Sequence, residues 1–304
     1  MLSDIPYIET YRGFANEERI IFNARLLKDK NHIANENDSF IVQLKNIFRK
    51  VASREIPFGN VSVSVNANNI PITADNEGYI FLDSDLNIQR NPETRWEKIS
   101  INARNNSFQC EYLIPSSRAA YGIITDIDDT ILVTDVHRPI SMLINSLFKN
   151  PFQRKSFNGI LEFYNLHSDQ GRNPVFYLSN SPWNLYQNIK QFLEIQHLPK
   201  GPILLRDYGL HFPRIPVAYS NHKEINIELL LEVYPRLPFI LIGDASQEDA
   251  FIYSHIKSKF PDRIKGIYIR EIDDHEKMEK LKNDPTINQE HMHYFKDYTS
   301  IEIQ

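Results

Sequence analysis

The stretch "GIITDIDDTIL", Gly122 to Leu132, places three aspartates within four positions directly after an apolar run. The run "YGIIT" before Asp126 is typical of a strand that is buried on both faces, as in parallel sheets. A carboxylate costs free energy when it is buried or crowded against another carboxylate. We therefore expect a cation or a reaction that keeps these charges together at the end of a buried strand.

The spacing of Asp126 and Asp128 is informative, because two carboxylates two positions apart leave an ending strand on one side and flank the same ligand. The alternative is an acidic loop that binds nothing or binds calcium. A calcium loop of the EF-hand type is disfavoured, because the glycine that it needs at its sixth position is Ile131 here. The motif alone does not decide between a functional site and an inert acidic loop, since short motifs also match by chance.

The composition indicates an ordered globular protein of about two domains, at roughly 150 residues per domain. The chain has 304 residues, of which 41% are hydrophobic and 24% charged. Its net charge of −5 provides no field that attracts nucleic acid over the whole surface, so no nucleic-acid partner is expected.

The sequence carries no sign of secretion or of membrane insertion. The single cysteine, Cys110, excludes an intrachain disulfide and fits a reducing compartment. The N-terminus lacks a basic head followed by an apolar core, and apolar runs such as 239–242 are too short to span a bilayer. We expect a soluble, cytoplasmic protein.

The pattern of the chain changes near Ser116. Before it, runs rich in β-branched and aromatic residues alternate with period two, which predicts antiparallel strands in a small β-sandwich over residues 1–117. These runs are "RIIFNARLL", "VSVSVNAN", "YIFLDSDL", "ISINARNN" and "FQCEYLI", with "DNEG" at 75–78 as a tight turn. After it, strands alternate with helices, which predicts an α/β domain with a parallel sheet over 118–304.

Four runs of the second half read as buried parallel strands: "YGIIT", "PVFYLS", "PILLRD" and "PFILIGD". In open α/β sheets, functional sites gather at the carboxyl ends of the strands. Asp126, Ser179 and Asp244 lie at such ends and should converge. Asp244 in particular is best explained as a ligand of a hard cation.

The segment "SNSPWNLYQNIKQFL" predicts a helix with Ser181 as its N-cap and Pro182 in its first turn. A helix that begins directly after a strand offers free N–H groups to an anion, and Ser179 and Asn180 would add a hydroxyl and an amide for phosphate. The structural alternative is that Ser179 to Ser181 only cap the helix.

A second helix begins near Lys223, where the helix dipole disfavours a cation unless an anion is near. A third begins near Asp249 in "GDASQED". Both residues also have a purely structural interpretation. Lys223 would then be an ordinary exposed lysine at a helix start, and Asp249 would form a capping pair with Ser246.

The order DxDxT, a serine after an apolar strand, a lysine that opens a helix and GDxxxxD resembles the four-motif pattern of haloacid dehalogenase superfamily phosphatases. "DIDDT", "YLSNSPWNLY", "LRDYG", "NHK" and "FILIGDASQED", with "YRGFANEERIIFNARLL" and "ADNEGYIFLD" before them, are similar to the actin-patch-type phosphatidate phosphatase family. This chain departs from the family at Ser246, where members often have glycine, and it lacks the proline-rich extension with which fungal members recruit endocytic partners.

The resemblance implies a haloacid-dehalogenase-like Rossmannoid sheet with a small cap insert, and an Mg²⁺-dependent phosphatase that forms an aspartyl-phosphate. It implies Asp126 as nucleophile, Asp128 as general acid and base, and Lys223 as the catalytic cation. The substrate-binding residues would be Ser179 and Asn180, with Thr130 holding the motif's backbone. The metal site would comprise Asp126, Asp128 and Asp244, with Asp249 orienting Lys223 or a metal-bound water.

The resemblance names phosphatidate as the substrate, which the residues alone leave open. Only about fifty residues separate the first two motifs, and they carry an apolar stripe that suits either a peripheral membrane contact or an ordinary cap helix. The stripe comprises Ile140, Leu143, Ile144, Leu147 and Phe148, followed by the basic and aromatic residues Lys149, Phe152, Arg154 and Lys155. A phosphatase of soluble phosphomonoesters and a catalytically silent lipid-binding module remain alternatives.

Overall fold

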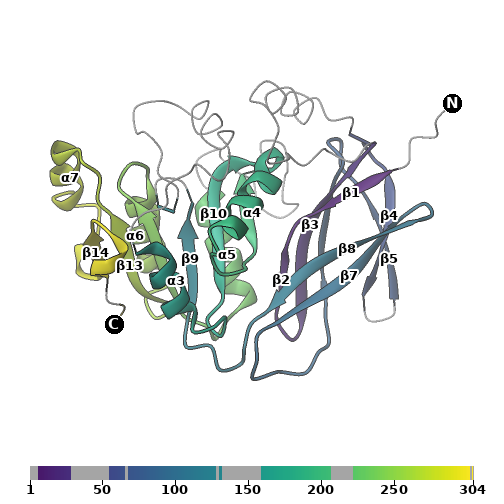
Figure 1. The fold of residues 1–304 in the computed structure, drawn as a ribbon, viewed down its shortest axis with the longest axis horizontal. Helices are drawn as coiled ribbons and strands as arrows, with labels where there is room; N and C mark the ends of the chain where they lie inside the picture. Colours follow the sequence, from purple (N-terminus) through teal and green to yellow (C-terminus); the bar gives the residue numbers. More distant parts are fainter. Residues whose placement is uncertain are drawn as a thin grey trace.

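The computed structural model describes residues 6–28, 55–65, 68–127, 130–131, 159–206, 222–301 and 303. They form two sheets that lie side by side (Figure 1). The first sheet uses residues 7–114, and the second begins at Gly122. Asp128, the apolar stripe at 140–148 and the basic residues at 149–155 lie outside the described residues.

The first sheet is mostly antiparallel and contains eight strands. Its strands are β1 (Tyr7–Thr10), β2 (Gly13–Ala15), β3 (Arg19–Leu27), β4 (Asn60–Val65), β5 (Asn68–Thr73), β6 (Tyr79–Asp85), β7 (Arg95–Ala103) and β8 (Asn106–Ile114). The sequence predicts two packed sheets, whereas the strand pairings connect all eight in one sheet. Side chains from seven of these strands share one buried core, and along β3, β4, β7 and β8 they come from alternate positions.

The turn predicted at 75–78 precedes β6 as expected. Asp75 accepts hydrogen bonds from the N–H groups of Glu77 and Tyr79 through its side chain. Gly78 has φ of 78°, a left-handed conformation that glycine adopts at little cost. The strands β1, β2 and β5 were not expected from the sequence, because they are short or, in β5, exposed along their length.

The second sheet is parallel, with the strand order β11-β10-β9-β12-β13-β14. The four predicted strands are present, and the sequence missed the last two. The strands are β9 (Gly122–Asp126), β10 (Val175–Pro182), β11 (Ile203–Arg206), β12 (Phe239–Asp244), β13 (Ile264–Arg270) and β14 (Met292–Phe295). The protein is thus a mixed α/β protein with separate parallel and mostly antiparallel sheets.

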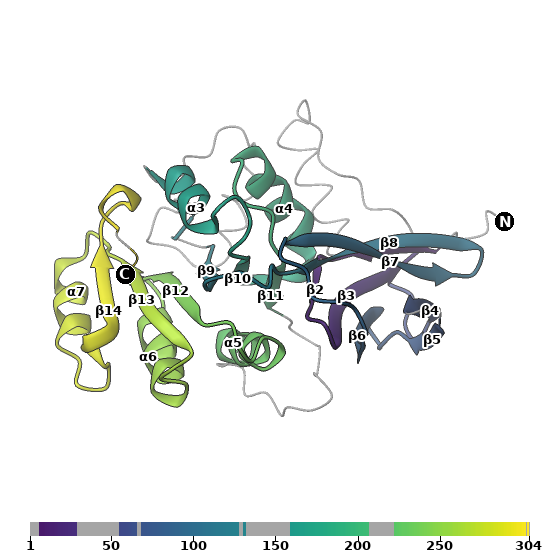
Figure 2. The same ribbon diagram turned by 90° about the horizontal axis from the view of Figure 1, so that it is seen from below.

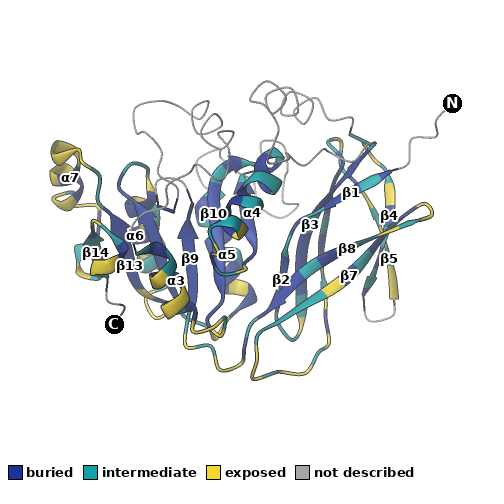
Figure 3. Cartoon of the chain, in the orientation of Figure 1, coloured by how far each residue is buried: buried dark blue, intermediate teal, exposed yellow. Residues whose placement is uncertain are grey.

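Helices cover both faces of the parallel sheet (Figure 2). They are α3 (Ile160–Ser168), α4 (Tyr186–Ile195), α5 (His222–Val233), α6 (Asp249–Lys259) and α7 (His275–Lys282), with short 3₁₀ turns at Trp183–Leu185, Gln289–His291 and Tyr298–Ser300. Along β9, Ile123 packs with α3 and α4, and Ile124 packs with α5 and α6. This alternation explains why β9 is apolar up to Thr125 and is buried along its whole length (Figure 3).

The two sheets share a buried interface. Phe14 of β2 packs against Phe176 of β10 and against Tyr234, whose hydroxyl donates to the carbonyl of Ala15. Arg19 of β3 forms an ion pair with Glu232 at the C-terminal end of α5. The first sheet therefore packs directly on helices that flank the second.

None of the helices in the described part of the chain is long and apolar enough to cross a membrane. The sequence also contains the pair "HMH" at 291–293, a pattern that occurs in metal sites but more often in solvated segments. These histidines lie at the edge of the second sheet. His293 is exposed on β14 and stacks against Tyr268. Neither His291 nor His293 belongs to a group of metal-ligating side chains among the described residues.

Candidate active site

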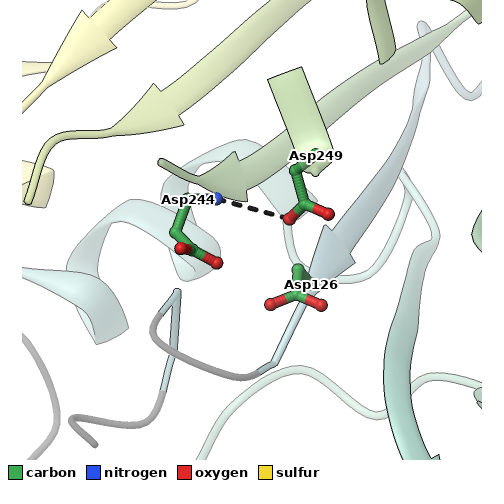
Figure 4. A group of neighbouring side chains, drawn as sticks. All are labelled: Asp126, Asp244 and Asp249. Carbon is green, nitrogen blue, oxygen red and sulfur yellow. Dashed lines mark hydrogen bonds between the residues drawn. The ribbon is translucent and has the colours of Figure 1, made fainter. Parts of the chain in front are cut away.

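Two aspartates end neighbouring strands at the same edge of the parallel sheet. Asp126 is the last residue of β9, and Asp244 is the last residue of β12, which pairs with β9. With Asp249 they form a group whose carboxylate oxygens lie within 4.8 Å of one another (Figure 4). All three side chains are fully buried. The predicted meeting of Asp126 and Asp244 is thus present in the structure.

Lys223 joins this group from the first turn of α5. Its Nζ lies 2.6 Å from Asp126 Oδ1 and also contacts Asp249 Oδ1. Burial opposes the charged form of Lys223, but the two carboxylates outweigh it, so its pKa is raised above the usual value. The unfavourable position of a cation at a helix start is therefore offset by two anions, as the sequence suggested.

Asp249 is the first residue of α6, and both of its oxygens have partners. Oδ1 contacts Lys223, and Oδ2 accepts a long hydrogen bond of 3.4 Å from the N–H of Asp244. A Cβ atom on Gly243 would lie 2.4 Å from that Oδ2, so the glycine lets the carboxylate approach the strand. This geometry favours Asp249 as the residue that orients Lys223 over a direct metal ligand.

Asp244 has one oxygen in use and one without a partner. Oδ1 accepts from the N–H of Ser246, so serine at the position where the family often has glycine keeps this contact. Oδ2 is buried and has no hydrogen-bond partner among the described residues. Burial, followed by the nearby Asp249 carboxylate, raises the pKa of Asp244 to about 7.

This group of side chains fits a hard divalent cation. The ionised carboxylates of Asp126, Asp244 and Asp249 exceed the single ammonium of Lys223 by two negative charges in a fully buried setting. Such an excess is costly without a counter-ion. The buried Oδ2 of Asp244 provides an oxygen ligand of the kind that Mg²⁺ prefers.

Ser179 and Asn180 follow the core of β10, beside β9. Ser179 Oγ accepts a hydrogen bond from the N–H of Ser181, and Asn180 Nδ2 donates to Gln247 Oε1 at 3.0 Å. The contact of Asn180 with Gln247 joins the end of β10 to the loop that follows Asp244. The sequence gave no reason to select Gln247, because amides in loops are common.

The helix predicted to begin at Ser181 begins later. Pro182 is the last residue of β10 and has extended backbone angles, with a 3₁₀ turn at Trp183–Leu185 and then α4. The prediction of Ser181 as N-cap was therefore wrong. Ser181 remains in the strand, where the register between β10 and β11 shifts after Ser179.

Thr130 is buried, and its backbone carbonyl accepts a hydrogen bond of 2.9 Å from the hydroxyl of Tyr298. Beside Asp126, the hydroxyls of Thr125 and Tyr164 are 2.6 Å apart. The sequence did not indicate Tyr164 or Tyr298, because they lie far along the chain and aromatic residues are plentiful. Tyr164 contacts the side chain just before Asp126, and Tyr298 bonds to the backbone after it.

A polar cavity of about 250 Å³ adjoins Lys223 and Asp249. Its lining comes from the end of β10, the end of β11, the first turn of α5 and the start of α6. These residues are Asn180, Arg206, His222, Lys223, Gln247, Glu248, Asp249 and Ile252. The cavity is large enough for a phosphate with a few attached atoms, and its lining suits polar ligands.

Comparisons with known proteins point to one family. Residues 121–271 match the family described as "Phosphatidate phosphatase APP1, catalytic domain". "Phosphatidate phosphatase APP1" of Saccharomyces cerevisiae is 32% identical over 167 residues, which cover 55% of this chain and 28% of that protein. An uncharacterized protein of Schizosaccharomyces pombe is 26% identical over 156 residues, covering 51% of this chain and 26% of that protein.

The chain thus spans about a quarter of the length of these curated relatives. Among solved structures, a carbohydrate acetylesterase from Xanthomonas citri aligns over 88% of this chain and 68% of that chain, with 9% identity and a TM-score of 0.30. That similarity is too weak to support a common fold. The match to the catalytic domain covers the strands that carry Asp126, Ser179 and Asp244, together with Lys223. Through residues 121–271, the chain belongs to the actin-patch-type phosphatidate phosphatase family.

Proposed function

We propose that this chain is an Mg²⁺-dependent phosphatidate phosphatase, which hydrolyses phosphatidate to diacylglycerol and phosphate. The observation that carries the proposal is the buried contact of Lys223 with Asp126 and Asp249, beside Asp244. The family match covers all four residues. The proposal includes a haloacid-dehalogenase-like domain from about residue 118 onward, since the parallel sheet carries Asp126 at the end of an inner strand.

The proposed reaction has two displacement steps. A carboxylate oxygen of Asp126 attacks phosphorus, the ester P–O bond breaks, and the leaving alkoxide takes a proton from Asp128. Water then attacks the aspartyl-phosphate at phosphorus and gives its proton to Asp128, which releases phosphate and restores Asp126. The role of Asp128 rests on its position in the DxDxT motif, because it lies outside the described residues.

Other residues of the site bind and orient the phosphate. Lys223 would contact a non-bridging oxygen, and Asp249 would hold the Lys223 ammonium in place. Ser179 and Asn180 would bind the remaining oxygens from the end of β10, and Thr130 would keep the Asp126 loop in position. Mg²⁺, held by Asp126, Asp244 and the backbone carbonyl of Asp128, would supply the positive charge that lets a carboxylate approach an anionic phosphate.

The choice of phosphatidate rests on the family match and on the insert between the first two motifs. The polar cavity beside Lys223 supports a monoester head group, while the acyl chains would stay in a bilayer. The apolar stripe at 140–148, with Lys149, Arg154 and Lys155 after it, would hold the site against an anionic membrane, at about 1 kcal/mol per basic residue. The proposed setting is cytoplasmic and peripheral to membranes.

The test compares phosphate release from phosphatidate vesicles with release from soluble glycerol phosphate, with and without Mg²⁺. We expect vesicle activity to be higher, to fall with salt, and to fall when Phe148 and Phe152 are changed to serine. Leu166→Ser is the matched control, because Leu166 is 72% exposed on α3, outside the apolar stripe and the basic residues that follow it. Its vesicle activity should equal that of the unaltered protein.

Two results would replace the proposal with its alternatives. Equal turnover of soluble esters, with vesicle activity unaffected by the phenylalanine changes, would indicate a phosphatase of soluble phosphomonoesters. Vesicle binding without phosphate release from any ester would indicate a catalytically silent lipid-binding module.

A further inference from the structure

The first sheet touches the second sheet next to the residues that follow Ser179 and Asn180. The ring of Tyr11, in the turn between β1 and β2, stacks on Trp183 with 4.5 Å between ring centroids. The same ring lies 4.6 Å from that of Tyr186, at the start of α4. Trp183 and Tyr186 also stack on each other. Aromatic contacts of this kind add about 0.5–1.5 kcal/mol per pair to the effect of burial.

Two hydrogen bonds accompany this aromatic group. The backbone N–H of Arg12 donates to the hydroxyl of Tyr186 at 2.6 Å, and Arg25 Nη1 donates to Asn184 Oδ1 at 2.5 Å. Both run from the first sheet to residues within seven positions of Ser179. Every contact in this set therefore joins the N-terminal part of the chain to one short segment, residues 183–186.

Arg25 is itself held rigidly. Its Nε donates to the carbonyl of Glu77, its Nη2 contacts Glu55, and its guanidinium lies 4.5 Å from the centroid of the Tyr79 ring. It is 5% exposed. The other partners already order the guanidinium, so binding Asn184 costs it little additional conformational entropy. Arg25 therefore acts as a fixed support for the Asn184 side chain.

The supported segment lies at the junction between β10, which ends at Pro182, and α4, which begins at Tyr186. The pairing of β10 with β11 shifts register after Ser179, and Pro182 provides no side-chain cap to the 3₁₀ turn that follows. The regular hydrogen bonds of α4 begin at Tyr186. At this junction, a single 3₁₀ turn connects β10 to α4, and Tyr11 and Arg25 contact it from the first sheet.

We infer that the first sheet is a positioning element of the phosphate site, with Tyr11 and Arg25 as the positioning residues. This inference rests on the proposed function, because it assigns phosphate binding to Ser179 and Asn180. Tyr11 and Arg25 fix Trp183 and Asn184, and these fix the strand end that holds Ser179 and Asn180. Loss of either contact loosens the binding of phosphate itself.

The experiment measures the dissociation constant of inorganic phosphate in the presence of Mg²⁺. The chain contains two tryptophans, Trp96 and Trp183, so Trp96→Phe leaves Trp183 as the reporter of its own segment. We expect phosphate to change the emission of Trp183. In this background, Tyr11→Ala and Arg25→Ala should each raise the dissociation constant by about tenfold, the effect of losing roughly one contact of this strength.

Two controls separate positioning from general stability. Tyr11→Phe keeps the stacked ring and should keep the phosphate affinity. Arg19→Ala removes another arginine of β3 that contacts α5, but its partner Glu232 lies at the opposite end of α5 from Lys223. The dissociation constant of phosphate from the Arg19→Ala variant should change less than twofold. If Tyr11→Ala does not fold, Arg25→Gln and Asn184→Ala give the same comparison.

The possible failures are distinguishable. If Arg25→Ala and Tyr11→Ala bind phosphate as tightly as Arg19→Ala, the positioning role is overturned while the proposed phosphatase stands. If calorimetry detects no binding of phosphate to the Trp96→Phe protein with Mg²⁺, the proposed function is overturned, and this inference with it.

Discussion

Lys223 Nζ lies 2.6 Å from Asp126 Oδ1, and both residues are at most 2% exposed. The contact joins the first turn of α5 to the end of β9, across 97 positions of the sequence. This lysine balances part of the buried negative charge, and in the proposed function it would also bind an anion that enters beside Asp126. The proposal therefore makes catalysis and stability depend on the same contact.

We expect Lys223→Met to lower kcat/KM for phosphatidate by at least about 10²-fold, since it removes a charge-assisted contact with the transferred phosphate. The metal-free variant should also melt earlier, because the loss of one partner of a buried ion pair costs about 3–5 kcal/mol. Lys280→Met is the control, since Lys280 pairs with Glu276 on the surface. A Lys223→Met protein with normal kinetics would contradict the site.

The nucleophile is tested by Asp126→Asn, which keeps the shape of the side chain but removes its charge. We expect at least about 10²-fold loss of phosphate release, and a similar loss for Asp128→Asn. Asp262→Asn, at an exposed position, should leave the rate unchanged. Phosphate release should also stop in EDTA. Full activity in the chelator, or turnover by Asp126→Asn, would show that the mechanism is wrong.

The raised pKa of Asp244 predicts how the stability of the metal-free protein depends on pH. Its folded-state pKa of about 7 lies above the ordinary value of 3.8, so the folded protein holds this proton more tightly. The resulting stabilisation is complete below about pH 4 and is lost as the pH rises through 7. Because the proposed metal ligand is deprotonated Asp244, Mg²⁺ should raise the melting temperature more at pH 8 than at pH 5.5. Calorimetry with EDTA or Mg²⁺ tests both statements. In the Asp244→Asn variant, the rise in melting temperature caused by Mg²⁺ should differ less between pH 5.5 and pH 8.

The hydrogen bond from Tyr298 to the carbonyl of Thr130 predicts an effect on catalysis from near the end of the chain. Tyr298→Phe should lower kcat severalfold with little change in KM, because the loop after Asp126 loses a support while the phosphate contacts remain. The cost in stability should be about 1 kcal/mol. Tyr294→Phe is the matched control, because the hydroxyl that it removes donates to Gln289 and not to Thr130. Equal kcat values for the two variants would remove Tyr298 from the site.

The parallel strands and their order of motifs were readable from the sequence, because both follow from local patterns. A strand covered by helices on both faces is nearly continuously apolar, and β9, β10 and β12 each begin with such a run before their polar ends. The carboxyl ends of parallel strands meet at one edge of a sheet, which predicts from the sequence that Asp126 and Asp244 lie together. The roles of Ser179, Asn180, Thr130 and Asp128 stay predictions.

The contacts that shape the site came from tertiary structure alone. The start of the helix after Pro182 was misjudged, because serine and proline are favoured at helix starts, yet here β10 continues and Tyr11 packs against Trp183. Tyr298 could not be linked to Thr130, since no local pattern relates residues 168 positions apart.

The sequence by itself determined the identity of the charged residues, the strands that carry them and the family, since each depends on short-range spacing. Only the tertiary structure decided that Asp249 contacts Lys223, that Asp244 keeps a buried oxygen without a hydrogen-bond partner among the described residues, and that the first sheet contacts residues 183–186. These depend on burial and on which distant side chains meet. Both are properties of the packed chain, because the free energy of a buried charge is set by all the atoms around it.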